Sequence, residues 1–436
     1  MLKVIDENIF REFALKNPYV SIYQLPEWGE LKSGTGWVRH LLGYYKNDSL
    51  VGVTMLLEKR MPMKLSLFYS PRGYLIDVYN FSLLKKFNDE VIKYVKKNHG
   101  FMLKLDPNVI YALRDSDGNL KEKCGEEAYY NFKKLGFKHM GFSQNFEDLQ
   151  PRILCRIKLR DNYNDTLNTF SKSTKKNIDK TYDMGVRCKI INTDNIDIFT
   201  KLLQDTGNLK NFIVRPASYY KKMVDLMGDY ITLYLAYIDT ECYYNYVWST
   251  LSGAKKELDE LNNTMKKINV GDKIKRKHEE LENKINKYNK KLEEAESLKR
   301  SNKEINIGAL MSVFVGNEGI TFMSGTNNLY KEFNPKYAFY RQHIEDSIKK
   351  HLEYVNFYGI SLDMDKNGPY YGIYELKRGF NPEITELIGE FDYVINPFVY
   401  YAYKVALKGY KLLKKLKKLW RYNLKYKKFI MKLILT

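Results

Sequence analysis

The sequence contains no long hydrophobic run, so none of its 436 residues suggests a transmembrane helix. A helix that crosses a bilayer needs about 20 consecutive apolar residues. Residues 1–7 also lack the apolar stretch of a secretory signal peptide. Cysteine is scarce, and the four that occur are spaced neither as zinc ligands nor as a disulfide framework. We therefore expect a cytosolic protein whose thiols are ordinary core residues.

Common nucleotide and metal motifs are missing as well. The chain has no G-x-G-x-x-G or P-loop sequence, no G-x-S-x-G elbow and no His-Glu-x-x-His pair. These motifs hold dinucleotides, triphosphates, a serine nucleophile and zinc, respectively. A nucleotide-hydrolysing, nicotinamide-linked or zinc-dependent enzyme is therefore unsupported, and we expect neither a cofactor nor a metal.

Negative charge is scarce relative to positive charge. The chain has 72 Lys and Arg against 52 Asp and Glu, a net charge of +20. This excess predicts an anionic partner, either nucleic acid or a membrane surface. Twelve of the basic residues, and no acidic ones, lie between Tyr400 and Thr436. Hydrophobic residues make up 44% of the chain, which permits a packed core, and the length predicts two or three domains.

The basic C-terminal tail also carries an apolar stripe. Residues at helical spacing form it: Leu412, Leu413, Leu416, Leu419, Trp420 and Leu424. A helix with Trp and Leu on one side and lysines on the other is typical of an anionic membrane surface, which is the interpretation we favour. A helix docked on its own domain and a nucleic-acid contact are the alternatives.

A second unusual segment, residues 252–304, has a single aromatic residue, Tyr288. It combines fifteen Lys or Arg and eleven Asp or Glu with apolar residues at heptad spacing on both sides of Gly271-Asp272. Gly suits the end of a helix and Asp the start of the next. We predict an inserted antiparallel coiled-coil arm that acts as a spacer, a dimerisation element or a prop for an elongated substrate.

Helix and strand signals alternate on either side of this arm. Residues 81–98 are typical of an amphipathic helix, and residues 101–105 of the strand that follows. Residues 230–238 and 243–249 are aromatic-rich and predict strands, and a turn at 316–319 predicts a strand pair. This mixture predicts an α/β (α+β) fold rather than a helical bundle or a sandwich.

Four segments resemble the Fem family of aminoacyl transferases that build peptidoglycan cross-bridges. The resemblance covers about residues 20–400, and the segments that carry it are Gln24–Lys32, Ser70–Gly73, Arg215–Tyr220 and the series Asn356–Gly359, Gly372–Asn381 and Ile388–Asp392. The family implies two acetyltransferase-like (GNAT-like) subdomains. The first would comprise residues 1–150 and about 385–436. The second would comprise residues 151–384, interrupted by the arm.

The resemblance also implies a function. A Fem-like enzyme moves an amino acid from aminoacyl-tRNA to the free amine of a peptidoglycan precursor, on its stem peptide or on a growing bridge. The precursor is lipid II or its nucleotide form, UDP-MurNAc-pentapeptide. We expect a cytoplasmic protein, peripheral at the inner face of the cell membrane through its basic tail, and an oligomer with itself or with related transferases is one possibility.

Roles for five residues follow from the same resemblance. Lys32 and Arg215 resemble the pair that grips the precursor diphosphate, a task suited to two cations. Tyr219 would share a helical face with Arg215 and hydrogen-bond the same ligand. Lys377 resembles a lysine that acts at the aminoacyl ester or the tRNA end. Asp106 resembles an acid that helps deprotonate the attacking amine. The structural alternatives are solvated lysines and a turn aspartate at a strand end.

Two other functions compete with this one. A coenzyme-A-dependent N-acetyltransferase would use the same fold, but the sequence lacks the glycine-rich loop that holds the pyrophosphate of that cofactor. A non-catalytic, membrane-associated coiled-coil adaptor would explain the arm and the tail, but it leaves Lys32, Arg215 and Lys377 without a purpose.

Overall fold

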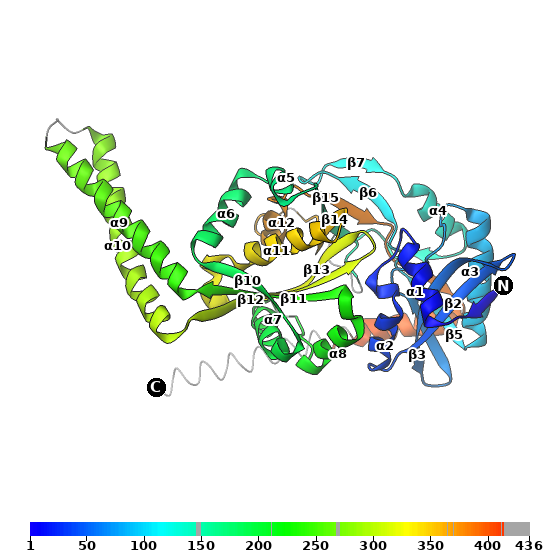
Figure 1. The fold of residues 1–436 in the computed structure, drawn as a ribbon. Coiled ribbons are helices and arrows are strands. Elements are labelled where there is room, and N and C mark those ends of the chain that lie inside the picture. The colour runs from blue at the N-terminus through cyan, green and yellow to red at the C-terminus, as the bar shows by residue number, and fades with distance from the viewer. Residues whose placement is uncertain are drawn as a thin grey trace.

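A computed structural model describes residues 1–144, 150–210, 212–266, 271–363, 365–368, 370–410 and 412–413. Two β-sheets with helices packed on them form an elongated body, from which a helical hairpin projects at one end (Figure 1). The predicted α/β fold is confirmed, and both sheets are mixed. No helix within the described ranges is long and apolar enough to cross a membrane.

In the part of the chain that the structure describes, the first sheet has seven strands, and all neighbours are antiparallel except the parallel pair β4 and β5. Its strands, in spatial order, are β1 (Leu2–Val4), β2 (Val38–Lys46), β3 (Ser49–Met61), β4 (Leu65–Ser70), β5 (Gly100–Leu105), β16 (Phe391–Val394) and β8 (Lys138–His139). A late strand, β16, thus lies between β5 and β8, so the C-terminal part of the chain returns to the N-terminal sheet.

The described residues form nine strands in the second sheet, with one parallel pair, β13 and β14. In spatial order they are β10 (Val186–Ile191), β11 (Ile231–Asp239), β12 (Glu304–Val315), β13 (Glu318–Thr326), β14 (Tyr354–Gly359), β9 (Ile153–Lys158), β15 (Glu383–Leu387), β6 (Ile110–Arg114) and β7 (Leu120–Lys123). Val315 pairs with Glu318, so the predicted hairpin turns at Gly316-Asn317. Because β6 and β7 join this sheet, the chain passes between the sheets more than once, and the division into two subdomains near residue 150 stays a prediction.

Helices cover both sheets. Those near the first sheet are α1 (Glu7–Lys16), α2 (Pro26–Ser33), α3 (Phe81–Lys97) and α4 (Glu126–Lys134). Those around the second sheet are α5 (Tyr163–Asn168), α6 (Lys172–Asp183), α7 (Ile196–Lys210), α8 (Ala217–Met227), α11 (Pro335–Lys349) and α12 (Tyr371–Arg378). Short 3₁₀ turns occur at Ile22–Gln24, Thr193–Asn195, Gly228–Tyr230 and Asn328–Phe333. The amphipathic helix predicted at residues 81–98 is confirmed as α3, which Asn80 caps.

One apolar cluster joins the two halves of the body. Helices α1 and α2 contribute Phe10 and Trp28, and helix α7 contributes Phe199. Strands of both sheets meet these helices through side chains such as Val53 of β3 and Met311 of β12. Full burial of a large apolar side chain contributes about 1.5–3 kcal/mol, so this shared core holds α2 against α8. That contact positions the residues described below.

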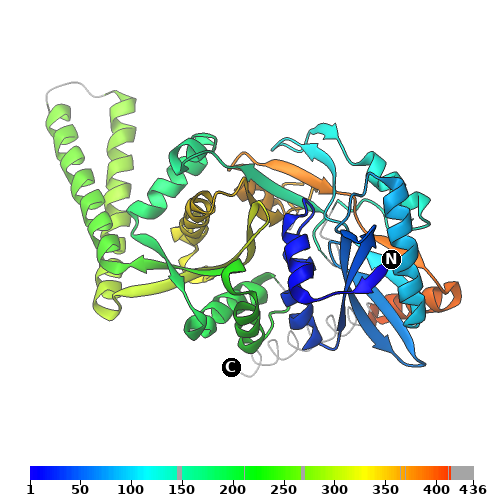
Figure 2. The ribbon, with the colours of Figure 1, turned by 45° about the vertical axis from the view of Figure 1, so that its right-hand side comes forward.

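Two long helices form the arm, and they lie side by side away from the body (Figure 2). They are α9 (Thr240–Met265) and α10 (Asp272–Ser301). The predicted strand at residues 243–249 is wrong, because this segment is the first part of α9. Asp239 caps it by accepting a hydrogen bond from the Cys242 N–H at 2.9 Å, and Val247 and Leu251 follow Tyr243 into the core at four-residue spacing. The helical pair is as predicted, whereas its coiled-coil winding stays a prediction.

Residues 397–410 form a C-terminal helix, and one side of this helix packs on the first sheet. The Tyr400 hydroxyl is buried and donates to Asp392 Oδ2 at 2.9 Å. The other side faces solvent, where Phe398 is 84% and Val405 71% exposed. The predicted apolar stripe begins at the exposed Leu412 and Leu413, and its remainder lies outside the described residues.

Candidate active site

Three of the predicted residues, Lys32, Arg215 and Tyr219, lie together where α2 packs on α8. Arg215 precedes α8, which begins at Ala217, so the prediction that it shares a helical face with Tyr219 is wrong. Lys32 Nζ donates to the Tyr219 hydroxyl at 3.4 Å and lies 4.5 Å from the ring centroid of Trp28. The guanidinium carbon of Arg215 lies 5.8 Å from the Tyr219 ring. Lys32 and Tyr219 are 187 positions apart in the sequence, so the tertiary fold forms this cluster.

The electrostatics of this cluster favour an anion. Burial lowers the pKa of Lys32, and the positive charge of Arg215 lowers it further, to about 8. Among the described residues, no carboxylate forms an ion pair with either cation. The charge of Arg215 acts unfavourably on the Lys32 ammonium, and a bound diphosphate would relieve that repulsion. The phenol of Tyr219 stays neutral, because burial raises its pKa.

Lys377 lies elsewhere, on the inner face of α12. Its side chain is buried, and Nζ donates to the carbonyl oxygens of Gly359 at 2.8 Å and Tyr358 at 3.5 Å. Burial lowers the pKa of Lys377 to about 8, and the charge of Lys336 on α11 acts in the same direction. A cation held by main-chain carbonyls in a dry site can stabilise negative charge that develops nearby. No motif in the sequence singled out Lys336.

Asp106 follows β5 and is buried. Its Oδ1 accepts the Arg72 N–H at 2.9 Å, and its Oδ2 lies 3.6 Å from the Arg72 guanidinium. Burial raises the pKa of Asp106 to about 6, although Arg72 opposes that shift. The guanidinium also donates to the Pro151 carbonyl at 2.6 Å, so it bridges two segments of the chain. The carboxylate therefore anchors the Pro71-Arg72 turn, which the sequence singled out only as a motif.

A pair of tyrosines connects the separate parts of the site. The hydroxyls of Tyr23 and Tyr358 are 2.6 Å apart. The Tyr23 ring packs edge-on against Trp28 at 4.6 Å, and Trp28 carries Lys32 on its face. Tyr358 in turn offers its carbonyl to Lys377. Sequence analysis missed Tyr23 because nothing local marks a tyrosine that pairs with another residue 335 positions away.

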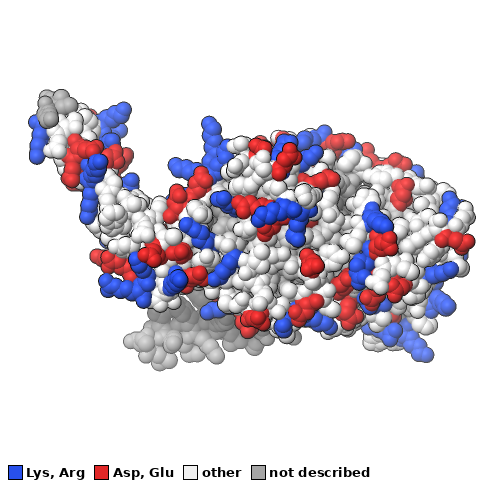
Figure 3. Space-filling model, viewed as in Figure 1, with Lys and Arg blue, Asp and Glu red and all other residues white. Residues whose placement is uncertain are grey.

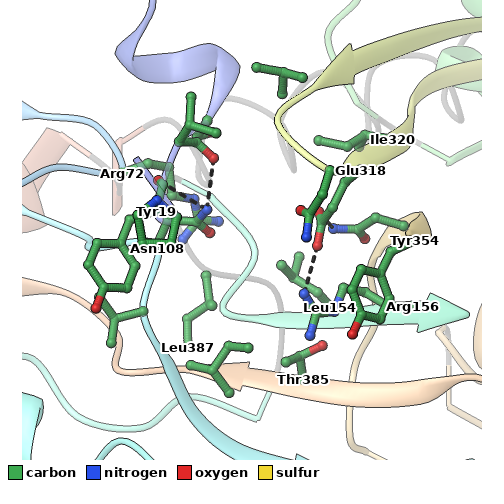
Figure 4. Close-up of a pocket in the computed structure, with 18 of the residues that line it drawn as sticks. Tyr19, Arg72, Asn108, Leu154, Arg156, Glu318, Ile320, Tyr354, Thr385 and Leu387 are labelled. Carbon is green, nitrogen blue, oxygen red and sulfur yellow. Dashed lines mark hydrogen bonds and ion pairs between the residues drawn. The ribbon is translucent and has the colours of Figure 1, made fainter. Parts of the chain in front are cut away.

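A cavity of about 440 Å³ opens on one side of this tyrosine pair. Lys32, Lys377 and Asp106 do not line it. An ion pair between Arg156 and Glu318, at 2.7 Å, forms part of one wall, and Asn356 donates to the same carboxylate at 2.9 Å (Figure 4). The opposite wall holds Tyr19, Arg72 and Asn108 (Figure 4). No group of three or more His, Cys, Asp or Glu suited to a metal occurs in the described ranges.

Comparison with known proteins decides the family. The model of the FemAB family matches residues 5–408. The chain belongs to the FemAB family. The resemblance predicted from four motifs is therefore confirmed. Two similar relatives are aminoacyltransferase FemA of Staphylococcus epidermidis, 30% identical over 94% of this chain and 98% of the relative, and FemA of Staphylococcus aureus, 29% identical over 92% and 97%.

The fold agrees with that assignment. A crystal structure of FemX superimposes with a TM-score of 0.72 and covers 92% of this chain and 99% of FemX, at 23% sequence identity. At that identity the likeness concerns the fold. Family membership, this fold and the Lys32–Arg215–Tyr219 cluster are the three observations on which a functional assignment rests.

Proposed function

We propose that this protein is an aminoacyltransferase that moves an amino acid from aminoacyl-tRNA to the amine of a peptidoglycan precursor. The observation that carries the proposal is the pair of unneutralised cations, Lys32 and Arg215, beside the hydroxyl of Tyr219. Membership of the FemAB family and the FemA aminoacyltransferases among its relatives support the enzyme class. Both lipid II and its nucleotide form carry the diphosphate that such a pair would grip.

The chemistry needs no redox step. The acceptor amine, once neutral, attacks the carbonyl carbon of the aminoacyl ester. A C–N bond forms, the C–O bond to the terminal ribose breaks, and the ribose hydroxyl regains a proton. The protein must position the two substrates and stabilise the oxyanion that develops on the carbonyl.

We assign two residues to these tasks. Lys377, held by two carbonyls in a buried site, would stabilise the oxyanion or the departing ribose oxygen. Asp106, with a pKa raised to about 6, would receive the proton of the attacking amine. Its contacts with Arg72 also support a structural role, and the Asp106→Asn variant distinguishes the two roles. Loss of turnover with unchanged thermal stability supports a catalytic Asp106, whereas loss of stability supports an anchor.

We propose that the C-terminal helix and tail bring the enzyme to an anionic membrane. On the face shown in Figure 3, basic and acidic side chains are interspersed over the body. The excess charge of the tail, with the exposed Phe398 and Val405 on the helix that precedes it, suits a lipid surface rich in anions. A position at the inner face of the membrane would place the enzyme beside a lipid-linked precursor. Assembly with itself or with related transferases stays a prediction.

A transfer assay tests the proposal. Purified protein is incubated with radiolabelled aminoacyl-tRNA and with either lipid II or UDP-MurNAc-pentapeptide, and label in the peptide is measured. Amide-linked label that requires both substrates supports the function, and a screen of charged tRNAs identifies the amino acid. Acetylation of an amine from labelled acetyl-coenzyme A would instead favour the acetyltransferase, and no transfer from either donor would favour the adaptor.

A further inference from the structure

Tyr358 has an unusual backbone for a residue inside a strand. Its φ is +67°, in the left-handed region that residues other than glycine and asparagine rarely adopt. The Asn356 side chain accepts the Tyr358 N–H at 2.8 Å and donates to Glu318 at 2.9 Å. The register between β14 and β9 shifts between Asn356 and Gly359. The strand therefore contains a bulge, and Tyr358 lies at its apex.

The bulge directs the main chain toward Lys377. The carbonyls of Tyr358 and Gly359 both accept from its ammonium group, whereas successive carbonyls of a regular strand point to opposite sides. The charges that face Lys377 from the neighbouring elements are the cation Lys336 on α11 and the thiol Cys155 on β9. Neither group is an anion at neutral pH. Lys336 is a lysine, and burial raises the pKa of the Cys155 thiol to about 12, so the thiol stays protonated. The carbonyls of the bulge are therefore the groups that hold the ammonium.

The side chain of Tyr358 extends in another direction, toward the first half of the body. Its hydroxyl donates to Gln150 Oε1 at 2.8 Å and lies 2.6 Å from the Tyr23 hydroxyl. Tyr23 packs on Trp28, and the Lys32 ammonium group lies over the Trp28 ring. Tyr358 thus holds Lys377 through its own carbonyl and contacts Tyr23, which packs on the Trp28 side of the cation cluster.

We propose that Tyr358 is a positioning residue for the transfer reaction. Its left-handed main chain fixes the position of the Lys377 ammonium group. Its hydroxyl connects that position to the Lys32–Arg215–Tyr219 cluster. The distance between the donor and acceptor ends of the reaction is then fixed through one side chain. This inference rests on the proposed aminoacyl transfer.

Two small substitutions isolate the main-chain role. Tyr358→Gly and Tyr358→Ala both remove the side chain, but only glycine adopts a positive φ without strain. We expect the alanine variant to turn over more slowly than the glycine variant, by roughly fivefold or more. In a Lys377→Met background, the carbonyls have no ammonium to hold, so the two variants should turn over equally. Rates are measured well below the melting temperature of every variant.

Hydroxyl deletions isolate the side-chain role. Tyr358→Phe and Tyr23→Phe remove the same hydrogen bond, so each should lower kcat several-fold with little change in either KM, and the double variant should be no slower than the slower single variant. Tyr374→Phe is the matched control. It lies on the same helix as Lys377, and its hydroxyl donates to the Ser116 carbonyl at 2.9 Å, away from the linked pair. Its turnover should be unchanged.

The outcomes separate this inference from the proposed function. The main-chain role is overturned if the turnover of Tyr358→Ala relative to that of Tyr358→Gly is the same in the parent and in the Lys377→Met background. Tyr358 would then act on the fold alone. Additive hydroxyl deletions overturn the link. If the unaltered protein transfers no amino acid, the proposed function fails, and thermal unfolding tests the geometry. The difference in melting temperature between the alanine and glycine variants should shrink in the Lys377→Met background, and an unchanged difference would refute the contact.

Discussion

The protonation of Lys32 should control how tightly the protein binds the precursor. Arg215→Ala has two consequences at this site. It would remove the proposed charge-assisted hydrogen bond to the precursor, which would be worth about 1.5–3 kcal/mol. That loss should raise the apparent KM for the precursor by roughly 10- to 150-fold. It also removes the positive charge that lowers the pKa of Lys32, so the pH dependence of binding should change as well.

The direction of the pH effect follows from the causes of the shift. Lys32 has a pKa of about 8, so its ammonium group is lost as the pH rises through that value, and the KM for the precursor should rise with it. In Arg215→Ala the like charge is gone and the rise should begin at higher pH. Burial is the larger cause and remains, so the pKa stays below the ordinary value of 10.5. In Lys32→Ala this rise should be absent.

The assay varies the precursor at saturating aminoacyl-tRNA, and then the reverse, at several pH values between about 6.5 and 9.5. Lys221→Ala is the matched control, because this exposed lysine of α8 pairs with Asp225 at 3.7 Å rather than with the cluster. The Lys32→Ala, Arg215→Ala double variant should lose less than the sum of the single losses, since both cations would bind one diphosphate. Equal losses toward both substrates, or an Arg215→Ala profile identical to that of the parent, would refute the reasoning.

Three further predictions concern other parts of the molecule. Lys377→Met should lower turnover while the melting temperature stays near that of the parent, because methionine keeps the apolar stem without the charge; full turnover removes Lys377 from the chemistry. A chain that ends at Tyr410 keeps the docked Tyr400 but loses most of the basic tail. It should no longer sediment with anionic vesicles, yet it should act on the nucleotide-linked precursor. Unchanged vesicle binding would contradict the membrane role. Burial lowers the pKa of His343 to about 4, so the folded state should lose up to about 3 kcal/mol of stability as the pH falls from about 6.5 toward 4. Denaturant unfolding at several pH values should show a flatter dependence for His343→Leu, and equal slopes would argue against a buried neutral histidine.

Local patterns predicted much of the fold. The amphipathic spacing at residues 81–98 and the glycine turn at Gly316-Asn317 each correspond to an element of the structure. They succeed because helix periodicity and turn geometry depend on near neighbours. Residues 243–249 show the opposite case. Their aromatic content favours a strand, but an aspartate cap and burial of every fourth residue make them helical. Tertiary packing outweighs a propensity difference of about 1 kcal/mol.

The candidate site divides in the same way. Motifs in the sequence predicted Lys32, Arg215, Tyr219, Lys377 and Asp106 as candidate site residues, and their roles stay predictions. The same motifs placed the chain in its family, because a motif survives in the order and spacing of its residues. Sequence alone could not indicate that Lys32 meets Tyr219 across 187 positions or that Tyr23 meets Tyr358 across 335. It also could not indicate that Lys32 and Lys377 would have pKa values near 8. A pKa depends on burial and on charges brought close by the fold, and these are properties of the folded chain rather than of any local segment.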